Sequence, residues 1–176
     1  MRRFIRRTPF VILFALSALT TLLAQPAGAQ PAEPKPVELD CAKGVSAQML
    51  GNGAPAAAGG QTLVLIRIIF GPGGSIGAHT HPGTLVATVE SGTLGFTLLD
   101  DMEMTVTRAG SGGTPAAEEP LTVDQEVELA AGDGFVETGM VHTARTIGDE
   151  PASVLISGLI EAGGPLTQCV DEPPAS

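Results

Sequence analysis

Residues 73–81 read GGSIGAHTH, a glycine-rich turn that runs directly into His79 and His81. These two histidines stand two positions apart, and alternate side chains of a β-strand point to opposite faces, so both imidazoles project from one face. Neutral imidazole nitrogen is a ligand for zinc, iron, nickel, copper and manganese to differing degrees. The stretch therefore predicts a strand that carries half of a metal site.

The alternation of side chains continues beyond the two histidines. Leu85 and the residues in step with it are apolar, so the surface beside the imidazoles is expected to be apolar, whereas Glu90 has the opposite parity and should face outward. The third and last histidine, His142, lies in another β-like segment at residues 141–146. Placed beside the first pair, it would complete a face of three nitrogens.

The rest of the sequence is typical of an all-β domain. Apolar and β-branched segments recur at short intervals, and none has a long 3.6-residue period. They cover residues 63–70, 85–90, 93–99, 102–107, 121–129, 134–137, 141–146 and 153–160. Residues 109–120, rich in glycine, serine, proline and glutamate, are expected to form a surface loop. The chain has 176 residues, with 23 glycines and 14 prolines, which suits many short strands in one domain. The pattern predicts a β-sandwich or a small barrel.

Charge and aromatic content narrow the range of partners. The chain carries 9 basic and 19 acidic residues, a formal net charge of −10. That balance repels phosphate backbones and anionic lipid, so nucleic-acid binding and a membrane-surface role are disfavoured. Aromatic residues make up 3%, with no Trp and no Tyr, which removes the usual platforms for stacking bases and sugars. The expected partner is a small-molecule ligand or substrate.

The N-terminal residues 1–29 have the pattern of a signal peptide. Arginines at positions 2, 3, 6 and 7 precede an apolar run over residues 10–23, and Ala27-Gly28-Ala29 offers the small residues that a signal peptidase reads. The alternative, a permanent membrane anchor, would need about 20 apolar residues. We therefore expect cleavage near Ala29 and export to the periplasm or the medium, without a stable membrane anchor.

Cys41 and Cys169 are the only cysteines and bracket most of the mature chain. In an exported protein, an even cysteine count indicates a disulfide. The alternatives are two free thiols or a metal-binding pair, although the spacing is unlike any zinc motif. Around the β-rich region, residues 61–160, we expect an extended N-terminal linker at residues 30–60 and a C-terminal tail at residues 161–176 that contains Cys169.

Two motifs resemble those of the cupin family. Residues 73–81, followed by Gly92, are similar to its first motif, in which a glycine, five residues and His-x-His precede an acidic ligand and a second glycine. Residues 132–142, GDGFVETGMVH, resemble the second motif, which closes with a histidine. The resemblance covers about residues 61–160. It implies a double-stranded β-helix (jelly-roll) barrel whose mouth holds a divalent transition metal (Fe, Mn, Ni, Cu or Zn) on His79, His81 and His142.

The sequence departs from the family pattern at three positions. Leu85 stands where the family places its glutamate ligand, Glu137-Thr138 replaces the usual proline in a shortened second motif, and Thr146 stands where the family often has Asn. The fourth metal ligand is therefore in doubt. Glu137 is the one other carboxylate that we expect near the metal ligands. The shortened turn leaves open whether its side chain points into the pocket.

The resemblance implies two classes of function. One is a metal-dependent enzyme that catalyses oxidation or isomerisation of a small molecule, with no catalytic acid or base assigned beyond Glu137 as a candidate. The alternative is a non-catalytic barrel that is metal-free or binds a small ligand. Cupins often pair through their sheet edges, so a homodimer is the default expectation. One barrel hosts many unrelated activities, and the family alone does not select among them.

Overall fold

The computed structural model describes residues 35–37, 39–111, 114 and 116–171. The chain divides into two units, residues 1–32 and 33–176, and the described residues all belong to the second. The expected signal peptide, residues 1–29, lies outside the described residues. Within them, no helix has the length and apolar character that crossing a bilayer requires.

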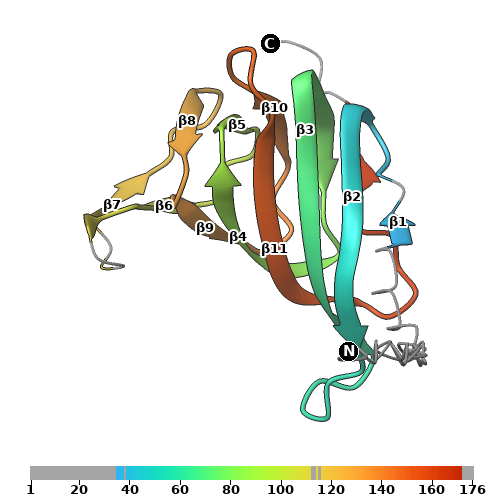
Figure 1. The fold of residues 1–176 in the computed structure, drawn as a ribbon. Coiled ribbons are helices and arrows are strands. Elements are labelled where there is room, and N and C mark those ends of the chain that lie inside the picture. Colours follow the sequence, from blue (N-terminus) through green and yellow to red (C-terminus); the bar gives the residue numbers. More distant parts are fainter. Residues whose placement is uncertain (1–34, 38, 112–113, 115, 172–176) are drawn as a thin grey trace, which may run out of the picture. The chain divides into compact units, whose positions relative to one another are not determined.

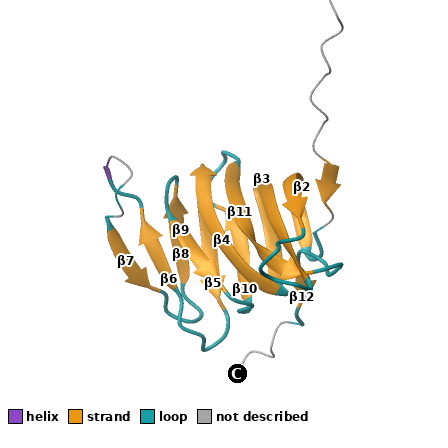
Figure 2. Ribbon diagram, turned by 90° about the horizontal axis from the view of Figure 1, so that it is seen from below, coloured by secondary structure: helices purple, strands orange, loops and turns teal. Residues whose placement is uncertain are grey.

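The described residues form a curled, antiparallel sheet of twelve strands (Figures 1 and 2). Its main path runs β7-β6-β9-β4-β11-β3-β10-β5-β8, while β2 and β12 also pair with β3 and β1 pairs with β2. The strands are β1 (Lys35–Val37), β2 (Ala42–Gly53), β3 (Gln61–Thr80), β4 (Gly83–Ser91), β5 (Thr93–Leu98), β6 (Thr105–Arg108), β7 (Ala117–Pro120), β8 (Glu126–Ala130), β9 (Gly134–Glu137), β10 (His142–Thr146), β11 (Ala152–Glu161) and β12 (Gln168–Cys169).

Strand β3 runs through the glycine-rich stretch that the sequence pattern treats as a turn. Its first half pairs with β11 up to Phe70, and its second half pairs with β10 from Ser75 onward. Between these partners, a Cβ on Gly74 would lie 2.7 Å from the carbonyl oxygen of Gly44, so the chains pass too closely for a side chain. The hydroxyl of Thr146 donates to the carbonyl of Gly71 at 2.7 Å and fixes this corner. The corner delivers the end of β3, with its histidines, to β10.

The expected linker at residues 30–60 contains a long strand of the sheet. β2 pairs with β3 over most of its length, and Ala47 is part of the core. The expectation of a linker was wrong for this stretch because its alanines and glycines give little of the apolar alternation that marks a strand. The expected surface loop before residue 120 likewise contains β7, whose four residues are all exposed.

The core lies along the inner face of the curled sheet. As the alternation predicted, Leu85, Ala87 and Val89 of β4 are buried, whereas Val86 between them is 54% exposed. Burying each apolar side chain contributes about 1.5–3 kcal/mol. The other large, fully buried apolar side chains are Val64, Ile66, Phe96, Leu98, Val106 and Leu129.

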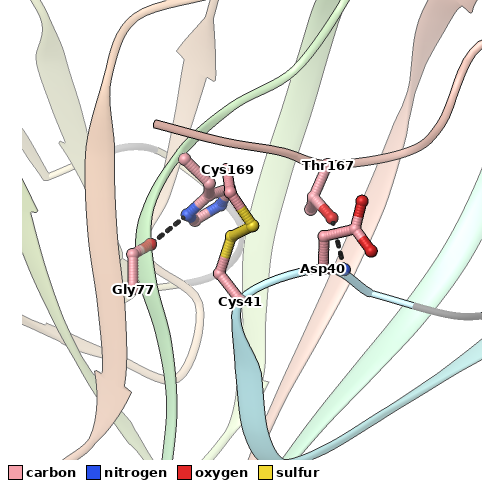
Figure 3. Close-up of a disulfide and its surroundings, with 6 residues drawn as sticks. Asp40, Cys41, Gly77, Thr167 and Cys169 are labelled. Carbon is pink, nitrogen blue, oxygen red and sulfur yellow. Dashed lines mark hydrogen bonds between the residues drawn. A yellow bond between two sulfur atoms is a disulfide. The ribbon is translucent and has the colours of Figure 1, made fainter. Parts of the chain in front are cut away.

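The predicted disulfide between Cys41 and Cys169 is present, with a Cα–Cα distance of 5.8 Å (Figure 3). It joins the residue that precedes β2 to the short strand β12, which pairs with the end of β3. Beside it, the backbone N–H of Asp40 donates to the hydroxyl of the buried Thr167 at 3.1 Å. The C-terminal segment is therefore a strap fastened across the end of β3, up to its last described residues.

Candidate metal centre

The three histidines meet at one end of the sheet. His79 belongs to β3, His81 follows its last residue, and His142 opens β10, directly opposite His79 in the β3–β10 register. Each side chain offers one nitrogen, and these atoms all lie within 4.8 Å of one another. The three residues are 2%, 5% and 4% exposed. As predicted, His79 and His81 point to the same face of the sheet, and His142 lies beside them.

Each imidazole makes the same kind of hydrogen bond through its Nδ1 atom. The acceptors are the carbonyl oxygens of Gly77 for His79 at 2.8 Å, of Leu166 for His81 at 2.6 Å, and of Met140 for His142 at 3.1 Å. A carbonyl only accepts, so the proton of each neutral ring resides on Nδ1 and the lone pair on Nε2. Backbone carbonyls commonly orient metal-binding histidines in this way.

Burial keeps the three rings neutral. Burial, and after it repulsion from His81, lower the pKa of His79 to about 4, against the hydrogen bond to Gly77, which raises it. Burial also lowers the pKa of His81 and takes that of His142 well below its ordinary value. At neutral pH the three rings therefore present lone pairs rather than charges.

The histidines line a cavity of about 40 Å³ whose remaining walls are almost wholly apolar. Phe96 stacks on His142, with ring centroids 4.7 Å apart and planes inclined by 23°. Leu85 also lines this cavity and is 1% exposed, so the place where the resemblance expects a glutamate ligand faces the imidazoles and carries no oxygen. The other apolar lining residues are Ile68, Phe70, Ile76, Ala87, Leu94, Phe135, Ala144, Val154 and Ile156.

Glu137 is the only acidic residue that lines the cavity in the described structure. It ends β9 and is 2% exposed. Its Oε2 accepts the backbone N–H of Gly139 at 3.2 Å, while its buried Oε1 has no hydrogen-bond partner. Burial raises its pKa to about 7, against the Gly139 N–H, which lowers it. The direction of this side chain, left open by the sequence, is therefore inward.

Glu90 lies outside the site, as its parity predicted. Its carboxylate accepts two hydrogen bonds from Arg67, at 2.6 and 2.8 Å, and one from the hydroxyl of Ser153. The sequence reasoning missed the part played by Leu166. Its contribution is a backbone carbonyl, which carries no side-chain signal, and it reaches His81 because the disulfide strap brings it there.

No protein-family model and no curated protein sequence matches the chain. Among solved structures, oxalate decarboxylase from Lactobacillus farciminis is similar over 78% of this chain and 33% of that chain, with 15% identity and a TM-score of 0.50. A cupin-2 domain protein from Rhodospirillum rubrum is similar over 79% and 74%, with 16% identity and a TM-score of 0.43. A polyketide cyclase from Streptomyces resistomycificus is similar over 80% and 84%, with 18% identity and a TM-score of 0.44.

At these identities the similarity concerns the fold. This chain spans about a third of the length of the Lactobacillus farciminis oxalate decarboxylase chain, which is the comparison with the highest TM-score of the three. The expected all-β, double-stranded β-helix (jelly-roll) barrel fold is confirmed. The chemistry has to be argued from the residues in the cavity.

Proposed function

We propose that this protein binds one divalent transition metal ion through the Nε2 atoms of His79, His81 and His142, and that the ion serves oxidation or isomerisation of a small molecule. The observation that carries this proposal is the common hydrogen-bond pattern of the rings. All three Nδ1 atoms are engaged by carbonyls, which leaves three Nε2 lone pairs at one cavity. Three neutral nitrogen donors suit zinc, iron, nickel and copper, and suit manganese less well.

A purely structural role for the histidines explains this arrangement less well. Burying three imidazoles in a largely apolar cavity costs desolvation at each ring, and their lowered pKa values reflect that cost. Apolar side chains would fill the same space without it. An ion that takes up the three lone pairs offsets the cost and accounts for the shared orientation.

The cavity size favours a small substrate over a stored apolar ligand. The cavity has about 40 Å³ of free space, which is enough for a few waters. A molecule that reaches the three nitrogens is therefore limited to a few heavy atoms, or enters with one end only. The cavity leaves little volume for the apolar ligand that a non-catalytic binding barrel would hold.

When bound, the ion would supply Lewis-acid or redox chemistry. The protein's own residues orient the ligands and exclude water. The carbonyls of Gly77, Leu166 and Met140 hold the rings in their tautomers, and the apolar walls exclude bulk water from the reacting group. Phe96 restrains the ring of His142 by stacking.

Element analysis of the mature protein, purified without a histidine tag, tests the proposal. We expect about one equivalent of a single transition metal per chain, and its loss in His79→Ala and in His142→Ala. Thr143→Ala is the control, since Thr143 neighbours His142 but is not among the residues that line the cavity. Absence of metal both as purified and after reconstitution would overturn the metal site. Substrate loss or oxygen uptake that disappears in His79→Ala would establish the enzyme.

We also propose that the protein is exported. The signal-peptide pattern of residues 1–29 and the Cys41–Cys169 disulfide support this location, because disulfides persist in oxidising compartments. N-terminal sequencing of protein recovered from the periplasm or the medium should begin at Gln30. Recovery of the uncleaved chain in the cytosol alone would contradict it.

A further inference from the structure

Leu85 and Glu137 face each other across the pair of strands β4 and β9. Directly opposed residues of antiparallel strands have Cβ atoms about 4.5–5.5 Å apart and point to the same face. Both of these side chains line the cavity of the three histidines. A carboxylate at position 137 therefore enters the cavity from the neighbouring strand, within one side-chain length of the place where the family resemblance puts a glutamate ligand.

One oxygen of this carboxylate has no partner within the described residues. Gly139 satisfies Oε2, and Oε1 is buried without a hydrogen bond. Leaving such an acceptor unpaired is unfavourable, and more so when the group is charged. Unsatisfied buried groups of this kind call for an explanation, such as a catalytic role or a bound water or ion. Oε1 is therefore available to a further partner in the cavity.

Electrostatics favours a cation as the partner of Oε1. A divalent ion on three neutral imidazoles would leave two positive charges in a largely apolar cavity, which is costly without a counter-charge. Asp133, the other buried acid of the described residues, is already paired, because it accepts hydrogen bonds from Arg108 and from two backbone N–H groups. Among the residues lining the cavity, Glu137 alone can lower the charge of the centre.

We propose that Glu137 is the fourth protein ligand of the metal ion, so that β9 supplies the carboxylate that Leu85 removes from β4. This inference rests on the metal site proposed above and adds to it a ligand from a different strand. Carboxylate oxygen suits manganese, whereas imidazole suits zinc and copper. Glu137 should therefore matter more for binding Mn²⁺ than for binding Zn²⁺.

Titration of the metal-free mature protein with Mn²⁺ and with Zn²⁺, against a competing chelator, tests the proposal. We expect Glu137→Leu and Glu137→Gln to weaken Mn²⁺ binding at least tenfold and Zn²⁺ binding by less. The exchanged variant, Leu85→Glu with Glu137→Leu, should restore Mn²⁺ binding. Glu128→Gln is the matched control, because Glu128 is an exposed glutamate of β8, the strand that precedes β9 along the chain.

Thermal unfolding of the metal-free variants separates lost ligation from lost folding. Glu137→Gln keeps an oxygen that can accept the Gly139 N–H, so its metal-free form should unfold at about the same temperature as the parent. Equal Mn²⁺ affinity in the parent and both single variants would overturn Glu137 as a ligand while leaving the three-histidine site intact. A parent protein that binds neither ion would overturn the three-histidine site and, with it, this inference.

Discussion

Cys169 lies directly opposite His79 in the pairing of β12 with β3. Its disulfide partner Cys41 accepts the backbone N–H of Gly77 through its carbonyl at 3.1 Å, and the carbonyl of Gly77 in turn accepts the Nδ1–H of His79. The disulfide is thus linked to the candidate metal ligand His79 through the hydrogen bonds of Cys41 and Gly77.

Removing the disulfide should weaken both stability and metal binding. The two cysteines are 128 residues apart, and closing a loop of that length stabilises by about 4–5 kcal/mol on the chain-entropy model. We expect Cys41→Ser/Cys169→Ser to lose roughly that amount in urea unfolding of the metal-free protein. Metal affinity should also fall roughly tenfold, because the carbonyl of Leu166 that orients His81 is carried by the same strap. Unchanged metal affinity would disconnect the strap from the site.

The stability of the metal-free protein should fall as the solution is acidified from pH 6.5 to 5. The three histidines have lowered pKa values when folded, to about 4 for His79, so the unfolded chain takes up protons in this range and the folded chain does not. Glu137 acts in the opposite sense: its folded pKa of about 7 lets the folded state take up its proton first. Three groups against one give a net loss on the order of 1–3 kcal/mol.

Urea unfolding at the two pH values measures this loss, and Glu137→Gln should make the dependence on pH steeper by removing the opposing group. The surface carboxylate Glu90 does not interfere, because Arg67 holds its pKa at about 2, so its contribution is lost only at lower pH. A stability that is flat or rises on acidification would contradict the burial of neutral imidazoles.

Asp133 of the second motif should prove structural. It accepts hydrogen bonds from Arg108 and from the backbone N–H groups of Ala109 and Ala130, at 2.7 to 3.0 Å, and it does not line the cavity. Asp133→Ala leaves these donors unpaired and should cost about 2–4 kcal/mol without changing metal affinity. Glu119→Ala removes the exposed partner of Arg108 instead and should cost less than about 1 kcal/mol. A loss of metal binding in folded Asp133→Ala would assign this residue to the site.

A methyl group at Gly74 should disturb the corner of β3. Its Cβ would meet the carbonyl oxygens of Gly44 and Gly71 at 2.7 and 2.8 Å. We expect Gly74→Ala to lower the free energy of unfolding by about 1–3 kcal/mol, because backbone has to shift. Gly51→Ala is the control, since its Cβ would meet nothing within 4 Å and should change stability by less than about 0.5 kcal/mol. Equal stabilities would show that the corner yields without strain.

The sequence predicted the features that depend on local spacing. The alternation of a strand predicts that His79 and His81 point to the same face. It also predicts that the side chain of Leu85 points into the barrel and that of Glu90 outward. All of these directions are found. The direction of the Glu137 side chain could not be predicted, because a shortened turn changes which face of the sheet the nearby side chains point to. Nor could the pairing that sets it opposite Leu85, since register between distant strands leaves no mark in either segment.

Long-range and backbone contributions were likewise hidden. β2 lacks a strong apolar alternation and owes its place to pairing with β3. The carbonyl that orients His81 belongs to a residue 85 positions further along the chain. Such contacts are made by groups that every residue possesses, so composition and motif carry no information about them.

The strap across the end of β3 also sets an order of events during biogenesis. A chain is synthesised from its N-terminus, and the ring of His81 acquires its carbonyl partner only once Leu166 has been made and docked. The hydrogen bonds that orient the three histidines are therefore complete only after the chain has been synthesised as far as Leu166. On the proposed export, the metal that the protein acquires would be decided by the ions available in the compartment where the chain folds.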